Sequence, residues 1–201
     1  MSDETWKAAK SPVMMDMVYY GEHYDARLEQ PGWCSSGFDD SGWEYAALRK
    51  APEGILKAHM AYPDRVMETL DPVRIEKQEG GRYKIDFGQE ISGWVRISGV
   101  QGNAGRVIDF DYICESTMGD NTYTLKGGEN ESYAARFTWF VFRQVVVNNW
   151  PGSLSADQIM AEAVYTDVET TGKFETSNPL FNAINRICWR SQTDNMHGAI
   201  A

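Results

Sequence analysis

Hydrophobic and polar residues alternate through the middle of the chain, from about residue 72 to 168. Every second side chain is apolar in residues 82–87, and residues 106–114 repeat the pattern with Ile108 and Phe110 on one face. A period of two is typical of a β-strand that buries one of its faces. We therefore predict that these segments are strands whose apolar faces line a core.

Similar runs recur at short intervals and are separated by turn-forming residues such as those at 101–105. The other predicted strands, some with their turns, are residues 94–98, 121–128, 137–140, 142–147 and 159–165. Because no amphipathic helix lies between them, we predict an antiparallel β-sandwich or jelly roll, with no helix between residues 82 and 112. We expect largely buried side chains at Tyr83, Ile85, Phe87, Trp94, Ile97, Ile108, Phe110 and Val146.

The pattern becomes helical near the end of the chain, at residues 177–195. Ser177 or Asn178 can cap this helix, and Pro179 suits its first turn. The apolar residues at helical spacing are Leu180, Ile184, Ile187 and Cys188. The predicted fold class is therefore all-β with a C-terminal α-helix. We expect the apolar stripe of the helix to form a homodimer, with docking on the sandwich as the alternative.

Residues 1–60 are irregular by comparison, with turn clusters at 30–32, 35–37 and 39–42. We predict three parts: a partial N-terminal β domain at 1–60, a β-sandwich at 61–170, and a linker with the helix at 171–201.

Composition narrows the range of functions. The 201 residues contain 19 Lys and Arg against 29 Asp and Glu, a net charge of −10, which argues against nucleic acid and anionic membrane surfaces as partners. No apolar run is long enough to span a membrane, and the first residues do not form a signal-peptide pattern. The three cysteines are widely spaced and leave the cellular compartment open.

One cluster of acidic residues is a candidate metal site. Asp109 and Asp111 lie two apart on one predicted strand, so that both carboxylates project from the same face. With Glu115 nearby, they could hold a hard cation such as Ca²⁺. A solvated outer face is the alternative that we favour, and no other cofactor is indicated.

A polar and aromatic string at 22–27 is a candidate carbohydrate site. Glu22, Tyr24 and Asp25 combine carboxylates with an aromatic ring, which suits ligands rich in hydroxyl groups, but Glu22 or Asp25 could instead pair structurally with Arg27. Trp33 and Trp43 are candidate stacking platforms, with burial against the sheet as the alternative.

Several strings together resemble a known family. These are residues 20–27, 31–33 and 37–43, then 83–89 with 92–94, and finally 121–127, 136–138, 142–143 and 171–184. In this order they resemble the N-terminal and central β-domains of bacterial α-L-rhamnosidases, the family 78 glycoside hydrolases. The resemblance covers residues 3–201.

This resemblance implies a parent enzyme that hydrolyses terminal α-L-rhamnosides with inversion. In such a mechanism a carboxylic acid and a carboxylate base stand about 6.5–9.5 Å apart. The family carries them in an (α/α)₆ barrel whose acid motif follows the helix at 177–195, and no residue here matches either group. We therefore expect a non-catalytic part of the enzyme, inactive alone, whose main partner is the catalytic domain. The alternatives are a Ca²⁺-dependent module that binds rhamnose-containing glycans and a protein-interaction sandwich.

Overall fold

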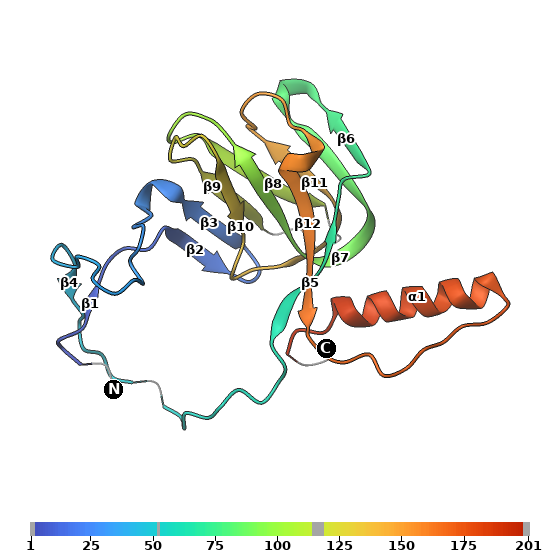
Figure 1. Cartoon of the computed structure of the whole chain (residues 1–201), viewed down its shortest axis with the longest axis horizontal. Coiled ribbons are helices and arrows are strands. Elements are labelled where there is room, and N and C mark those ends of the chain that lie inside the picture. Colours follow the sequence, from blue (N-terminus) through green and yellow to red (C-terminus); the bar gives the residue numbers. More distant parts are fainter. Residues whose placement is uncertain (1–2, 52, 114–118, 199–201) are drawn as a thin grey trace.

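The computed structural model describes residues 3–51, 53–113 and 119–198, and β-strands dominate them (Figure 1). The strands are β1 (Lys7–Ala8), β2 (Val13–Met17), β3 (Gly21–Asp25), β4 (Glu44–Tyr45), β5 (Asp64–Leu70), β6 (Arg74–Lys77), β7 (Tyr83–Val100), β8 (Val107–Ile113), β9 (Asp120–Thr124), β10 (Glu131–Ala134), β11 (Phe140–Asn148) and β12 (Ile159–Thr166). The helices are the 3₁₀ turns η1 (Ala26–Leu28), η2 (Glu79–Gly81) and η3 (Ala156–Gln158), and the α-helix α1 (Pro179–Asp194).

Ten of these strands form one curled sheet in the order β2-β3-β9-β8-β11-β7-β12-β5, with β6 and β10 also paired to β7. Its ladders are antiparallel except the pair of β3 and β9, which is parallel. The predicted antiparallel sandwich is thus confirmed, with one parallel pair that the sequence did not predict. This pair joins the first 60 residues to the rest of the sheet, while β1 and β4 form a separate two-stranded sheet.

The long strand β7 connects the two layers of the sandwich. Its first half pairs with β6 and β11, and its second half pairs with β10 and β12. The strand bends between these halves, where Gly88 has a φ of 78° and Gly93 lies against the backbone of Glu162. Glycine is needed at the first position for its left-handed conformation and at the second for close approach.

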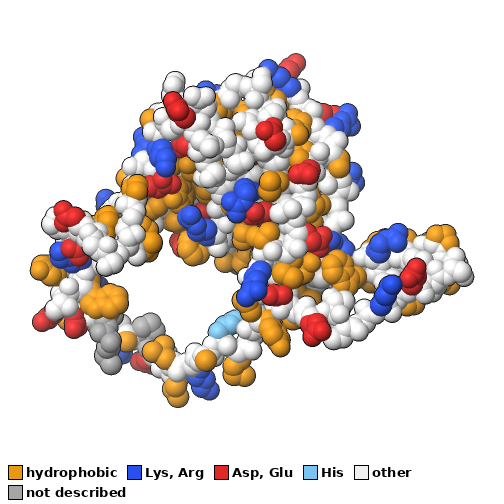
Figure 2. All heavy atoms as spheres, viewed as in Figure 1, with side chains coloured by type: hydrophobic (Ala, Val, Ile, Leu, Met, Phe, Trp, Pro, Cys, Tyr) orange, Lys and Arg blue, Asp and Glu red, His pale blue; other side chains and the backbone are white. Residues whose placement is uncertain are grey.

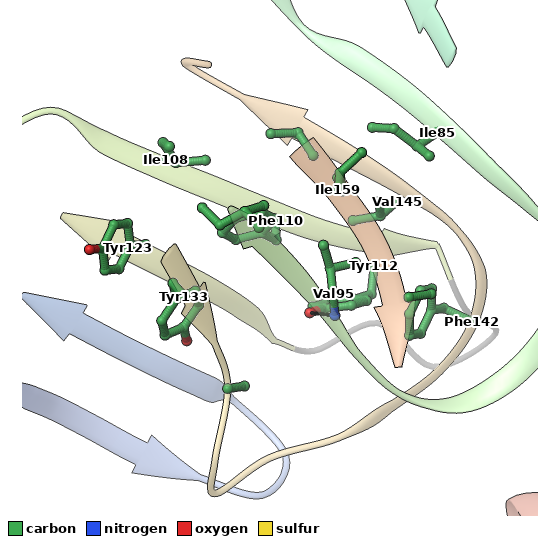
Figure 3. Close-up of a cluster of buried hydrophobic side chains, with 14 of the residues drawn as sticks. Ile85, Val95, Ile108, Phe110, Tyr112, Tyr123, Tyr133, Phe142, Val145 and Ile159 are labelled. Atoms are coloured by element: carbon green, nitrogen blue, oxygen red, sulfur yellow. Dashed lines mark hydrogen bonds between the residues drawn. The ribbon is translucent and has the colours of Figure 1, made fainter. Parts of the chain in front are cut away.

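The core lies between the layers of the curled sheet, and Figure 3 shows side chains from β7, β8, β11 and β12 meeting there. Its largest fully buried members include Tyr112, Tyr123, Phe110, Phe142 and Ile85. The ring centroids of Tyr112 and Phe140 are 4.6 Å apart, and those of Tyr123 and Tyr133 are 5.0 Å apart. Aromatic side chains therefore supply much of the buried area that stabilises the sheet.

Six of the eight side chains that we expected in the core are buried: Tyr83, Ile85, Phe87, Ile97, Ile108 and Phe110. The prediction was wrong for Trp94 and Val146, which are only partly buried. Strand geometry explains both errors. Val95 and Ile97 face the core from β7, so Trp94, one position before Val95, lies on the other face of the strand. Val146 lies between Val145 and Val147, which both face the core, and therefore points outward.

Two further sequence predictions concern helices and strand limits. In the described residues no helix interrupts 82–112, as expected, but the run at 137–140 contributes only its last residue to β11. Helix α1 confirms the predicted helix, because Asn178 caps it by accepting a hydrogen bond from the backbone N–H of Leu180, and Pro179 opens the first turn. In the described part of the chain, no helix combines the length and the apolar character that crossing a membrane requires.

Candidate functional site

Glu22, the first of the predicted carbohydrate-binding residues, is fully buried. Its carboxylate accepts hydrogen bonds from the Tyr133 hydroxyl at 3.0 Å and from the backbone N–H groups of Arg136 at 2.9 Å and Phe137 at 3.1 Å. These contacts connect β3 to β10 and to the segment that follows it. The side chain thereby positions Arg136 rather than facing solvent.

Tyr24 and Asp25 follow on the same strand. The Tyr24 hydroxyl donates to Oε1 of Glu29 at 3.0 Å, and the Arg136 guanidinium lies over the Tyr24 ring, 5.4 Å from its centroid. Burial is the main cause of a raised pKa at Tyr24. Asp25 forms a two-point ion pair with Arg27, the structural pairing that we had considered, and this pair lowers the pKa of Asp25.

Trp33 and Trp43 lie in the segment between β3 and the start of β5. Trp33 is 63% exposed, whereas Trp43 is partly buried against Phe38 and donates its indole N–H to Oε1 of Gln30 at 2.7 Å. Both tryptophans line a groove of about 910 Å³, which also includes Tyr24 and Pro31. The structure therefore brings Tyr24, Trp33 and Trp43 to one groove, while Glu22 lies beneath it.

The charged residues on the groove wall are mostly basic. In the described residues they are Lys10, Lys126 and Arg136 against Glu29, three positive charges and one negative. The Lys126 ammonium pairs with Oε2 of Glu29 at 2.6 Å, which leaves Lys10 and Arg136 without a matching carboxylate in the wall. The groove is therefore locally positive in a chain of net charge −10.

A second hollow of about 410 Å³ adjoins this groove and shares Tyr24, Glu29 and Arg136 with it. Trp94 and Arg96 form another part of its wall. Oε2 of Glu162 accepts the Trp94 indole N–H at 2.6 Å, and Oε1 of the same residue pairs with Nε of Arg96 at 2.5 Å.

Sequence reasoning missed Arg96 and Arg136 as site residues and assigned Trp94 to the core. The alternation that places Val95 and Ile97 inside was the available signal for Trp94, since it directs the preceding tryptophan to the outer face. The position of Arg136 depends on contacts with Glu22 and Tyr24, which lie more than a hundred residues earlier in the chain.

Asp109 and Asp111, two of the three predicted metal residues, lie on the outer face of the sheet. Oδ2 of Asp111 accepts a hydrogen bond from the Asn148 side chain at 2.8 Å. Burial, followed by the charges of Asp111 and Asp120, raises the pKa of Asp109 to about 6. Glu115 lies outside the described residues, and within them no three His, Cys, Asp or Glu side chains are arranged to hold a metal ion. The calcium site stays a prediction.

Comparison with known proteins defines the class to which these β-domains belong. A family model described as the alpha-L-rhamnosidase N-terminal domain matches residues 1–68. A second model, the bacterial alpha-L-rhamnosidase concanavalin-like domain, matches residues 76–165. The chain carries β-domains of a glycoside hydrolase family. Together these two matches show that the chain consists mostly of the N-terminal and concanavalin-like β-domains found in bacterial alpha-L-rhamnosidases.

Known α-L-rhamnosidases match nearly the whole chain in sequence and in structure. An alpha-L-rhamnosidase from Formosa agariphila is 33% identical across 98% of this chain, which covers 22% of that protein. The solved alpha-L-rhamnosidase from Dictyoglumus thermophilum superposes with a TM-score of 0.93 at 33% identity, covering all of this chain and 24% of that one. The Streptomyces avermitilis enzyme, solved with L-rhamnose, gives 0.89 at 30% identity and covers 21% of that chain. The chain thus spans between a fifth and a quarter of the length of these relatives.

Proposed function

We propose that this chain supplies the accessory, non-catalytic β-domains of an α-L-rhamnosidase-type glycoside hydrolase that cleaves terminal α-L-rhamnosides with inversion. The two family matches support this assignment, as does the coverage of only 22% of the Formosa relative. In such an enzyme the general acid and the general base belong to the remaining part of the polypeptide. The β-domains then brace that part and shape its approach.

Helix α1 provides the observation that carries this proposal. Its last turns are fixed to the sandwich, because Arg190 pairs with Glu68 at 2.7 Å and the carboxylate of Asp194 accepts the backbone N–H of Ser92 at 3.1 Å. Its apolar side chains stay exposed, namely Leu180, Phe181, Ile184, Ile187 and Trp189, and Figure 2 shows hydrophobic atoms along its surface. A helix held at one end with an open apolar face is suited to carry a neighbouring domain.

The first test asks whether residues 1–201 hydrolyse a rhamnoside by themselves. Purified chain is incubated with p-nitrophenyl α-L-rhamnoside, and the released nitrophenol is followed by absorbance. We expect no turnover above the blank. Turnover that a single substitution within the described residues abolishes would overturn the proposal.

A chimera supplies the positive test. Residues 1–201 replace the matching region of the Dictyoglumus thermophilum relative, to which they are 33% identical. We expect the chimera to cleave the same substrate and Ile184→Glu in α1 to lower that activity at least tenfold. Asn185→Glu, which adds the same charge at an exposed polar position, is the control and should have little effect.

Carbohydrate binding is a second candidate function, and the groove with its exposed Trp33 favours it. An indole face packs against the apolar face of a sugar ring, as aromatic side chains do in many ligand sites. Calorimetric titration with L-rhamnose, with and without Ca²⁺, tests this candidate and the calcium dependence together. Heat of binding that Trp33→Ala removes would support it.

A further inference from the structure

The groove lined by Trp33, Trp43, Lys10 and Arg136 combines two kinds of chemistry. The exposed Trp33 ring and the partly exposed Trp43 ring offer flat apolar surfaces, and the basic side chains offer positive charge. Its volume of about 910 Å³ lies near the upper end of the range found for small-molecule sites. The groove is therefore large enough for a short oligosaccharide.

Arg136 is held in place before any ligand binds. Its backbone N–H donates to the buried carboxylate of Glu22 at 2.9 Å, and its guanidinium lies over the Tyr24 ring. Glu29, the acidic residue in the described wall, is paired with Lys126, so that no carboxylate of the wall is paired with the Arg136 guanidinium; the buried Glu22 carboxylate bonds its backbone N–H instead. A guanidinium offers a planar set of N–H donors that matches a carboxylate or a sulfate in a two-point contact.

The aromatic residues make a sugar a better occupant than a simple anion. Trp33 is 63% exposed at the groove, where it can lie against the C–H face of a pyranose ring. Trp43 is fixed by its hydrogen bond to Gln30 and its contact with Phe38. An extended nucleic acid is disfavoured, because a chain of net charge −10 repels it and two uncompensated cations neutralise few phosphates.

We infer that this groove binds a short acidic oligosaccharide, with a carboxylate or sulfate group on Arg136 and a sugar ring on Trp33. The inference deepens the carbohydrate-binding candidate above and rests on it. Lys10 adds long-range attraction at the rim, where it is exposed. Binding should therefore weaken as the salt concentration rises.

The test is calorimetric titration of residues 1–201 with trigalacturonate, its trimethyl ester, a sulfated disaccharide and L-rhamnose. We expect trigalacturonate to bind at least tenfold more tightly than its ester, and 0.5 M NaCl to weaken it. Arg136→Gln should lower the affinity about 10- to 100-fold, as expected for a lost charge-assisted hydrogen bond. Trp33→Ala should abolish binding. Arg74→Gln, an exposed arginine on β6 outside the groove, is the matched control.

The outcomes distinguish carbohydrate binding by the groove from a preference for acidic sugars. Equal affinity for the acid and its ester, or binding unaffected by Arg136→Gln, would overturn the acidic preference and leave the carbohydrate candidate standing. Absence of binding by all four sugars would overturn both, without bearing on the chimera experiment. Binding of the sulfated disaccharide but not trigalacturonate would identify sulfate as the recognised group. Thermal melting of each variant establishes that it is folded.

Discussion

The Tyr133 hydroxyl donates a 3.0 Å hydrogen bond to Oε1 of Glu22, a residue 111 positions earlier in the chain. Both side chains are buried, and burial together with the Glu22 charge raises the pKa of Tyr133, so that it stays protonated as a donor. The backbone N–H groups of Arg136 and Phe137 complete the contacts of the carboxylate. Glu22 thus connects β3 to the wall of the groove.

Loss of this carboxylate should destabilise the protein strongly. Glu22→Ala leaves one buried and two partly buried donors without their acceptor, and we expect it to lower the free energy of unfolding by about 3 kcal/mol. Glu22→Gln keeps one side-chain oxygen as a hydrogen-bond acceptor and should lower the free energy of unfolding by less. Tyr133→Phe should lower it by about 1 kcal/mol. Urea denaturation followed by fluorescence measures all three. A Glu22→Ala protein within 0.5 kcal/mol of wild type would contradict this account.

Gly93 offers a second test of the packing between strands. A Cβ atom at this position would lie 1.9 Å from the backbone oxygen of Glu162, so β7 and β12 would have to separate. We expect Gly93→Ala to destabilise the chain by about 3 kcal/mol or more in the same assay. Gly42→Ala is the control, because nothing lies within 4 Å of the added methyl group. Similar stabilities of the two variants would show that the strands can yield at this point.

The parts of the fold that follow from local pattern could be predicted. Alternation placed Ile108 and Phe110 in the core correctly, and Asn178 with Pro179 defined the start of α1. Trp94 was misplaced because it was assigned to the core together with Ile97, although the two positions lie on opposite faces of the strand. The strand period itself contained the correct answer, since Val95 and Ile97 alternate with it.

The candidate site was less accessible to sequence reasoning. The aromatic residues of the groove, Tyr24, Trp33 and Trp43, were singled out from the short polar and turn-rich strings that contain them. Arg136 was not, because its place depends on Glu22 and on the parallel pairing of β3 with β9. That pairing joins segments about a hundred residues apart, and such long-range contacts leave no periodic trace in the sequence.

A histidine just after α1, His197, contacts the sandwich, and its protonation should weaken this attachment. His197 Nε2 lies 2.7 Å from Oγ of Ser92, its ring stacks on Trp139 at 4.4 Å, and Nδ1 lies 3.5 Å from Oδ2 of Asp64. Burial lowers the pKa of His197, partly opposed by the charge of Asp64. The contribution of neutral His197 is therefore complete above about pH 6.5 and is lost as the pH falls through the folded-state pKa.

Hydrogen exchange of the 193–197 amides, measured from pH 7.5 to 5, tests this direction of the pH dependence. The measured rates are first corrected for the pH dependence of exchange in an unfolded peptide. We expect protection to fall toward pH 5 in the wild type. His197→Gln cannot gain a proton and should show a flatter profile. Asp194, whose pKa burial raises, titrates in both proteins, so the difference between them isolates the histidine. Identical profiles would contradict the assigned role.

Asp109 gives a pH dependence of the opposite sign. Its pKa is raised to about 6 by burial and by the neighbouring charges of Asp111 and Asp120. The ionised carboxylate therefore costs stability above pH 6, and the cost disappears as the pH falls below the unfolded value of 3.8. Because the group is partly solvated, the full pKa shift overstates this cost. We expect Asp109→Asn to raise the free energy of unfolding by about 1–2 kcal/mol at pH 7.5 and to change it little at pH 4.

Urea denaturation at the two pH values measures this gain. Asp71→Asn, at an exposed position outside the acidic cluster, is the control and should change stability at neither pH. A destabilising effect of Asp109→Asn at pH 7.5 would show that its carboxylate makes a favourable contact. Repeating the measurement with Ca²⁺ tests whether that contact is with a cation.

Helix α1 should drive self-association of residues 1–201. Its exposed side chains include Leu180, Ile184 and Ile187, which recur at helical spacing and are each at least 47% exposed. Removing these apolar side chains from water is favourable, and the same stripe on a second copy provides an apolar surface that can cover them. We expect light scattering to give a dimer mass at high concentration. Ile187→Glu should yield a monomer, whereas Asn185→Glu should not. A strict wild-type monomer with slow amide exchange along 180–190 would mean that the helix docks on its own sandwich instead.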